Sequence, residues 1–406
     1  MKSLKLIRLI YKIHRNEPPR LEEIEEMGLL AVKISQYYAL RADFIDEKTC
    51  VYLSKLYEYS YAAQKREIDL AIDKDKWILD ALESYENLPF SSASIGQVHI
   101  GYLRGNDKED RKVAIKIRKE NFKESFLKDI ENAKKIANIL LFFYPKLKKV
   151  FNPLEVLENI EEGTLKELHF LNEVEGANYF ERLKNENSEK FDLKDLYFSS
   201  FVESLCCERV IVSKFIEGES FNTLLKEGRL KYSELLKLFK YHTFFMFKLG
   251  VFHGDLHPGN IILNENGEIT LIDCSTIGKV KSKLRKGLFG FFYYLSRYDY
   301  DKSAFYLNEM SEKRLNQKDF EKFLEKFKAL YSDFKDSSVS DVSLTKRMME
   351  TIKLSINSGM EFEEGMFHVI KSLMYLDGMV LKCNPEVNLM NDIREFTELL
   401  KSELKD

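Results

Sequence analysis

Cysteine, long apolar runs and surplus charge are all scarce in this chain of 406 residues. The five cysteines include no C-x-x-C pair, which argues against a disulfide framework or a zinc site and favours reduced thiols in the cytoplasm. No apolar stretch approaches the roughly 18–20 residues that cross a bilayer, so we expect no transmembrane helix. The net charge of −3 gives no general attraction to nucleic acid, so we expect no nucleic-acid partner.

One run of residues carries most of the functional information. His253-Gly254-Asp255-Leu256-His257-Pro258-Gly259-Asn260 is followed by a predicted hairpin with an Asn-Gly turn and then by Asp273. Kinase-type phosphotransfer needs an Asp that addresses the attacking hydroxyl or water, and an Asn and a second Asp that hold Mg²⁺. The spacing therefore predicts Asp255 as the catalytic residue and Asn260 and Asp273 as metal ligands. The alternative is an ordinary loop that happens to be rich in His and Asp.

A lysine and a phosphate loop precede this run in the order that a kinase-like site requires. Lys116 ends a Val-Ala-Ile-Lys strand, which makes it the natural partner of the nucleotide phosphates. Neither G-x-x-x-x-G-K-[ST] nor G-x-G-x-x-G occurs in the chain. A loop of small residues stands in that place instead, and small residues also let backbone N–H groups approach phosphate. We expect ATP contacts from Ser91, Ser92, Ala93, Ser94, Ile95, Gly96 and Val98.

Two further acidic residues belong to the predicted ATP site. Glu173 lies in a helical pattern that begins near Pro153, and we expect it to pair with Lys116. Glu217 lies in the predicted hinge 216–218, whose backbone would bind adenine. Taken singly, either residue could be ordinary surface charge.

Four motifs of this chain resemble motifs of the UbiB (AarF-type) family of atypical, protein-kinase-like proteins associated with ubiquinone biosynthesis. The loop at 91–99 is similar to the family's Ala-rich loop, and 253–260 to its His-x-Asp-x-His-Pro-Gly-Asn motif. Glu167 begins the match to a Glu-x-Asp motif. Lys33-Ile34-Ser35-Gln36 resembles a Lys-x-Gly-Gln motif, which Arg41 and Asp43 continue. The resemblance implies that Lys33, Gln36 and Glu167 form a gating element across the active site.

The chain departs from the family pattern at several positions. Ser35 replaces a Gly, His169 replaces an Asp, and Cys274-Ser275 follows Asp273 where Phe-Gly is expected. These changes leave the nucleotide and metal groups in place and alter the residues next to them.

The resemblance implies an α+β, bilobal protein-kinase-like fold. We expect a helical N-terminal extension over 1–88, an N-lobe over 89–217 and a helix-rich C-lobe over 218–406. Within the C-lobe, helical periodicity predicts segments at 281–300, 302–332, 342–358, 363–382 and 388–404. Short apolar runs at 136–144 and 288–295 predict buried helices.

The implied function is that of a Mg·ATP-dependent atypical kinase or ATPase that supports quinone or other isoprenoid-lipid metabolism. A lipid or quinone precursor is the implied ligand besides ATP. One alternative is a small-molecule phosphotransferase of the aminoglycoside or choline kinase type. Another is a nucleotide-binding pseudokinase that regulates a partner.

The first 15 residues interleave basic and apolar side chains. Such a basic amphipathic helix either binds an anionic membrane surface or packs on its own domain. The sequence therefore leaves peripheral membrane contact open for a cytoplasmic protein without a transmembrane helix.

Overall fold

The computed structural model describes residues 2–39, 41, 45–57, 72, 75–92, 95–105, 111–118, 122–143, 153–342, 344–363 and 365–401. The chain forms two compact units. Unit 1 comprises Met1–Asn185, Phe198–Glu217 and Asp273–Thr276, and unit 2 comprises Glu186–Tyr197, Gly218–Ile272 and Ile277–Asp406. The chain thus leaves unit 1 after Glu217, within the predicted hinge, while the predicted boundary after residue 88 stays a prediction.

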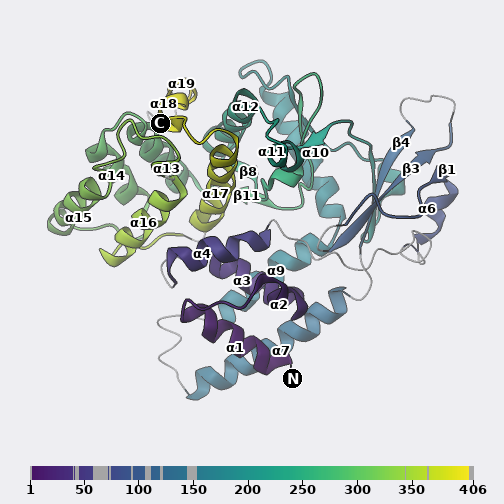
Figure 1. Cartoon of the computed structure of the whole chain (residues 1–406), viewed down its shortest axis with the longest axis horizontal. Coiled ribbons are helices and arrows are strands. Elements are labelled where there is room, and N and C mark those ends of the chain that lie inside the picture. The colour runs from purple at the N-terminus through teal and green to yellow at the C-terminus, as the bar shows by residue number, and fades with distance from the viewer. Residues whose placement is uncertain are drawn as a thin grey trace. The chain divides into compact units, whose positions relative to one another are not determined.

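Unit 1 contains an antiparallel sheet in the order β1-β3-β4-β6, with β2 paired to β3 (Figure 1). Its strands are β1 (Leu82–Tyr85), β2 (Ser91–Ser92), β3 (Gly96–Leu103), β4 (Lys112–Arg118) and β6 (Val210–Lys214). Val113, Ile115 and Ile117 alternate along β4 and are buried on one face of the sheet. The side chains of Ala114 and Lys116 therefore point to the opposite face.

Helices form a second part of unit 1. They are α1 (Lys2–His14), α2 (Leu21–Glu26), α3 (Leu29–Ala39), α4 (Glu47–Ser54), η1 (Lys55–Tyr57), α6 (Trp77–Asp80), α7 (Phe122–Phe143), α9 (Pro153–Leu168), α10 (Leu171–Asn187) and η3 (Glu203–Leu205). Helix α1 packs on α3 and α7, and α9 packs on α3 and α7 (Figure 1). The helices inserted after β4 therefore share one layer with those of the N-terminal extension.

The expected burial of the apolar run at 136–144 was wrong in part. Ile136 lines a groove between α3 and α7, but Ile139 is 58% exposed and Phe142 is 81% exposed. Because α7 contacts its neighbours along one stripe only, its remaining apolar side chains face solvent.

The helical pattern predicted to run on from Pro153 is broken at His169 and Phe170. Arg118 Nη1 donates to Leu168 O at 2.6 Å, and Phe170 N donates to Glu208 O at 3.1 Å. These bonds take up backbone groups that a continuous helix would pair internally, and the ring of Phe170 enters the core. Glu167 therefore lies at the end of α9, whereas Glu173 lies in the first turn of α10.

Unit 2 begins with short strands around the predicted catalytic run. The strands are β5 (Leu196–Phe198), β7 (Glu219–Ser220), β8 (Val251–His253), β9 (Ile261–Leu263), β10 (Ile269–Leu271) and β11 (Ile277–Lys279). The predicted hairpin is present, with Ile261 opposite Leu271 and Leu263 opposite Ile269. Gly267 has φ 77° at its turn, which is the conformation that the Asn-Gly sequence predicts.

Helices make up the rest of unit 2. They are α11 (Phe221–Lys226), α12 (Tyr232–Thr243), η4 (Phe244–Leu249), η5 (Pro258–Asn260), α13 (Ser282–Leu295), α14 (Tyr300–Met310), α15 (Gln317–Leu330), α16 (Leu344–Asn357), α17 (Gly365–Cys383), α18 (Leu389–Asp392) and α19 (Arg394–Leu399). Two predicted single helices are each divided. Segment 302–332 is divided between α14 and α15, because the side chain of Asn316 accepts a hydrogen bond from Asp319 N and so begins a new helix. Segment 388–404 is divided between α18 and α19.

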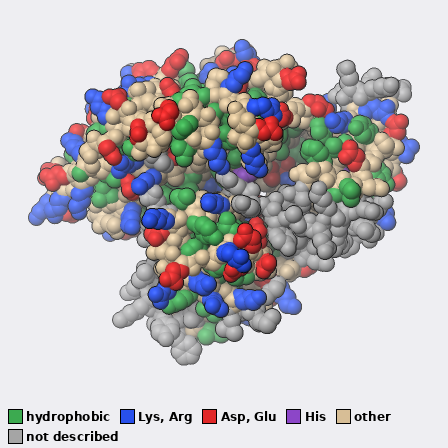
Figure 2. Space-filling model, in the orientation of Figure 1, with side chains coloured by type: hydrophobic (Ala, Val, Ile, Leu, Met, Phe, Trp, Pro, Cys, Tyr) green, Lys and Arg blue, Asp and Glu red, His purple; other side chains and the backbone are tan. Residues whose placement is uncertain are grey.

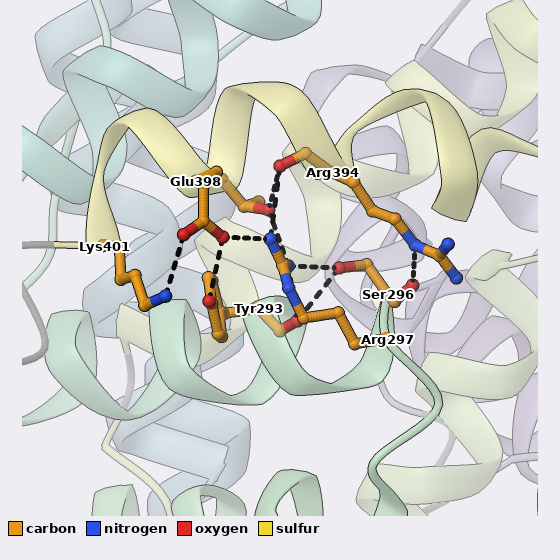
Figure 3. A network of polar contacts seen from close by, with 7 residues as sticks. Tyr293, Ser296, Arg297, Arg394, Glu398 and Lys401 are labelled. Carbon is orange, nitrogen blue, oxygen red and sulfur yellow. Dashed lines mark hydrogen bonds and ion pairs between the residues drawn. The ribbon is translucent and has the colours of Figure 1, made fainter.

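A polar network ties the C-terminal helix α19 to α13 (Figure 3). Glu398 accepts from Arg297 Nη2 at 2.6 Å, from Tyr293 OH at 2.9 Å and from Lys401 Nζ at 2.8 Å. Arg394 Nε donates to Ser296 O at 2.5 Å. Helix α19 is thereby attached to the buried apolar helix α13.

On the face shown in Figure 2, basic and acidic side chains are interspersed, in line with the net charge of −3. Among the described residues, no helix is long and apolar enough to cross a membrane.

Candidate functional site

Lys116 lies between two carboxylates of unit 1. Its Nζ is 2.6 Å from Glu173 Oε2 and 3.1 Å from Asp273 Oδ2. The side chains of Lys116 and Glu173 are only 14% and 8% exposed. The predicted pairing of Lys116 with Glu173 is therefore present, and Asp273 joins it.

This triad places one cation between two anions, with Lys116 and Glu173 largely buried and Asp273 partly exposed. Burial opposes the charge on Lys116, but Asp273 and Glu173 outweigh burial and raise the lysine pKa. Burial raises the pKa of Glu173 to about 7 against the attraction of Lys116, and the neighbouring Asp273 adds to the rise. With all three groups ionised the triad carries a surplus negative charge, which suits it to an added cation.

A close approach of α10 to the Asp273 loop positions Glu173. A Cβ atom on Gly176 would lie 2.0 Å from the carbonyl oxygen of Cys274, so only glycine fits there. Gly176 is three residues beyond Glu173 and shares its helix face. The sequence pattern did not identify Gly176, because a helical glycine has no signature before its neighbour is known.

Asp273 has a backbone conformation that is uncommon for a residue with a side chain. Its φ is 55°, in the left-handed region. Ser275 Oγ donates to Asp273 Oδ1 at 2.8 Å, while Cys274 is fully buried and burial raises its pKa. Ser275 and Cys274 thus orient and anchor the carboxylate in place of the missing Phe-Gly.

The loop of small residues leads into the same sheet. Ser91 and Ser92 pair with Val98 and Gln97, and Ile95 is buried. A Cβ atom on Gly96 would lie 3.0 Å from Ile117 O, so a larger residue would press on the strand that holds Lys116. The predicted contacts Ala93 and Ser94 lie outside the described residues.

The predicted gating residues are only partly brought together. Lys33 Nζ on α3 is 2.5 Å from Glu167 Oε2 on α9, whereas Gln36 donates to Leu56 O at 2.9 Å. Arg41 donates to the hydroxyl of Tyr37, and Asp43 lies outside the described residues. The expectation that Lys33 and Gln36 both address phosphates stays a prediction.

Two other predicted positions have distinct surroundings in unit 1. Glu217 at the hinge pairs with Lys112 at 2.9 Å and is exposed. His169 has a buried Nδ1 without a hydrogen-bond partner, in the break between α9 and α10.

The catalytic run of unit 2 forms a network of its own. His253 accepts from Asp255 N at Nδ1 (3.2 Å) and donates from Nε2 to Ile272 O (3.0 Å). Asn260 Nδ2 donates to Asp255 O at 3.0 Å, and Ile272 N donates to Asn260 O at 3.0 Å. The hairpin thus brings Asn260 beside the residue that precedes Asp273.

Helix α17 contributes two contacts that no sequence motif indicated. Lys371 Nζ is 2.9 Å from Asp255 Oδ1, and Tyr375 OH donates to the same oxygen at 3.2 Å. Burial alone would raise the pKa of Asp255, but Lys371 and the two nearby histidines lower it to about 2. These residues lie more than a hundred positions from the catalytic run, so local spacing could not reveal them.

The oxygen donors fit Mg²⁺ when each is taken separately. The amide nitrogen of Asn260 is held by its own loop, which leaves its side-chain oxygen as a ligand. Asp273 offers a carboxylate already oriented by Ser275. Among the described residues, no group of three or more His, Cys, Asp or Glu could hold a metal ion by itself.

Comparisons with known proteins give matches over most of the chain. The family model described as the ABC1 atypical kinase-like domain matches residues 62–307. An uncharacterised Clostridium pasteurianum protein from the hydrogenase 1 5′ region is 26% identical, with 93% of this chain and 70% of that protein covered. Proteins named probable protein kinase UbiB from Histophilus somni and Blochmanniella pennsylvanica are 24% and 25% identical. Each comparison covers 92% of this chain, with 69% and 68% of the respective relative.

A solved structure shares the fold. The Mycobacterium tuberculosis protein Rv3197, solved in complex with erythromycin, superposes with a TM-score of 0.53 at 15% identity. The match covers 95% of this chain and 96% of that chain. The predicted α+β, kinase-like fold is confirmed.

Proposed function

Because this chain belongs to the ABC1 atypical kinase-like family, as its motifs predicted, we propose that it binds Mg·ATP and hydrolyses it or transfers its terminal phosphoryl group. The observation that carries the proposal is the triad of buried Lys116 and Glu173 with partly exposed Asp273. A buried ammonium with two carboxylates is costly to maintain for stability alone. It is well suited to holding nucleotide phosphates and a metal ion.

Each predicted residue has a role in this proposal. Lys116 holds the phosphates and Glu173 orients Lys116. Asn260 and Asp273 hold Mg²⁺, which when bound neutralises charge on the phosphates. Asp255 orients the attacking hydroxyl or water.

The loop at 91–96 supports the same proposal from the phosphate side. Ser91 and Ser92 pair with β3, and β3 pairs in turn with the strand of Lys116. Small side chains in this loop would leave its backbone accessible to phosphate. The hinge at Glu217 supplies backbone groups for adenine.

We further propose that the acceptor, if there is one, is a small or lipid-linked molecule of quinone or isoprenoid metabolism. The resemblance of the motifs to the UbiB family, which is associated with ubiquinone biosynthesis, supports this, and relatives carry the name probable protein kinase UbiB. The pair of Lys33 with Glu167 ties α3 of the N-terminal extension to α9 of the kinase-like domain. Helix α1 adds a candidate membrane contact. It buries Leu9 and Ile13 in its own unit, yet Ile7 and Tyr11 are 41% and 58% exposed.

Calorimetric titration with ATP, with and without Mg²⁺, tests the central part. The parent should bind Mg·ATP, and Lys116→Met should abolish binding or weaken it by at least about tenfold, since a charge-assisted phosphate contact is worth about 1.5–3 kcal/mol. Lys353→Met, at an exposed position of α16, is the matched control. A parent that binds no Mg·ATP would reject the proposal.

Hydrolysis in the presence of anionic liposomes, with and without a prenylated phenol as quinone-precursor mimic, tests the lipid part. Turnover or phosphorylation should rise with the phenol. Liposome co-sedimentation of an Ile7→Ser/Tyr11→Ser double variant tests α1 without touching its buried face. Unchanged sedimentation would remove the membrane role of that helix.

A further inference from the structure

The catalytic run 253–260 contains no lysine or arginine. Phosphoryl transfer depends on positioned charge, and an Asp that orients a nucleophile must itself be held in place. In unit 2 this support comes from α17, on one helix face: Lys371 and Tyr375 are four residues apart.

The two oxygens of Asp255 have different surroundings. Oδ1 forms an ion pair with Lys371 Nζ at 2.9 Å and accepts a hydrogen bond from Tyr375 OH at 3.2 Å. Oδ2 accepts one hydrogen bond from the described residues, from Asn260 Nδ2 at 3.4 Å. Oδ1 is thus committed to α17, and Oδ2 is left to address a hydroxyl or water.

Helix α17 is itself fixed against the strand that leads into the catalytic run. Ser372 Oγ is 3.1 Å from His242 Nε2, and the His242 ring packs edge-on against Phe252 of β8. The ring of Tyr375 packs edge-on against His257 of the run. The side chain of Lys371 is 18% exposed, so its charge is directed inward.

We propose that Lys371 and Tyr375 are positioning residues for Asp255, which hold one carboxylate oxygen so that the other faces the nucleophile. This role rests on the proposed function, since it acts through Asp255. It gives helix α17 a part in catalysis.

The test is a double-mutant cycle on the full chain, with Lys371→Met, Asp255→Asn and their combination. Lys371→Met should lower kcat for Mg·ATP hydrolysis by about 10–50-fold and leave KM within about twofold, because it removes an interaction needed only for the reaction. Lys371→Arg should recover turnover to within about threefold of the parent, and Tyr375→Phe should cost about threefold. Lys382→Met, an exposed position on the same helix, should match the parent.

The combined variant decides how Lys371 acts. If Lys371 works through Asp255, adding Lys371→Met to Asp255→Asn should reduce kcat no further. Multiplied losses, or a KM effect without a kcat effect, would overturn the positioning role.

The unfolding midpoints of the parent, Lys371→Met, Asp255→Asn and the combined variant separate the positioning role from the proposed function. Should the parent bind Mg·ATP without turnover, the reaction proposal fails, but the midpoints still report the contact. Lys371→Met should then lower the unfolding midpoint when it is made in the parent. It should not lower the midpoint when it is made in Asp255→Asn, because Lys371 has already lost its carboxylate partner there. Equal decreases in both backgrounds would overturn the inference.

Discussion

The triad of Lys116, Glu173 and Asp273 predicts that substitutions of Glu173 and of Lys116 have opposite effects on the stability of the fold. In Glu173→Gln, Lys116 still forms its ion pair with Asp273 (3.1 Å), so the positive charge of the lysine stays balanced by one carboxylate. In Lys116→Met, the buried carboxylate of Glu173 and the partly exposed carboxylate of Asp273 remain without a cation. Removing one member of a buried pair in this way typically costs about 3–5 kcal/mol.

The pH dependence follows from the pKa of Glu173. Its folded pKa of about 7 lies above the ordinary value of 4.5. Its contribution to stability is therefore fully present below pH 4.5 and lost as the pH rises through 7. At 1.36 kcal/mol per unit, the parent should lose up to about 3 kcal/mol over this window.

Urea unfolding at pH 5 and pH 8, without nucleotide or Mg²⁺, measures these differences. Glu173→Gln should be at least as stable as the parent at pH 8 and should lose the slope between pH 4.5 and 7. Lys116→Met should be destabilised at pH 8 and partly restored at pH 5, where a carboxyl takes up a proton. Both variants should lose Mg·ATP turnover by about 10²-fold or more, since each disrupts phosphate positioning. Glu173→Gln proving less stable than Lys116→Met at pH 8 would refute the reasoning.

Two further predictions concern packing and the C-terminal network. Gly176→Ala should cost about 1–3 kcal/mol of unfolding free energy, because its Cβ would meet Cys274 O at 2.0 Å. Gly163→Ala, with open space in α9, should instead gain about 0.5–1 kcal/mol, and similar values for both would contradict the packing argument. Hydrogen bonds from Lys401 and Tyr293 lower the pKa of half-exposed Glu398 to about 2, so its contribution is present above pH 4.5 and lost as the pH falls through 2. The difference in unfolding free energy between Glu398→Gln and the parent, measured by urea unfolding, should therefore be below about 1 kcal/mol near pH 7 and shrink as the pH falls toward 2.

The sequence predicted those parts of the fold and site whose signals are local. The hairpin after Asn260 and the strand of Lys116 follow from turn chemistry and alternation, and both lie where expected. Glu173 was predicted from its helical pattern, although its helix was taken to be continuous with that of Glu167.

The remainder depends on contacts between distant segments. The break at His169 and Phe170 arises from bonds to Arg118 and Glu208, which helical periodicity does not encode. The same holds for Gly176 against Cys274 and for Lys371 against Asp255. Each of these contacts joins residues far apart in the sequence, so it can be recognised only after both segments have been placed in the fold.

The central claim is that the chain turns over Mg·ATP with Asp255 as the orienting carboxylate. The most direct measurement is phosphate release by Asp255→Asn and the parent, beside calorimetric Mg·ATP affinities and an exposed control, Asp301→Asn. Asp255→Asn should bind Mg·ATP as the parent does and release phosphate about 10²–10⁴-fold more slowly, while Asp301→Asn should match the parent. Phosphate release by Asp255→Asn at the parent's rate would contradict the account.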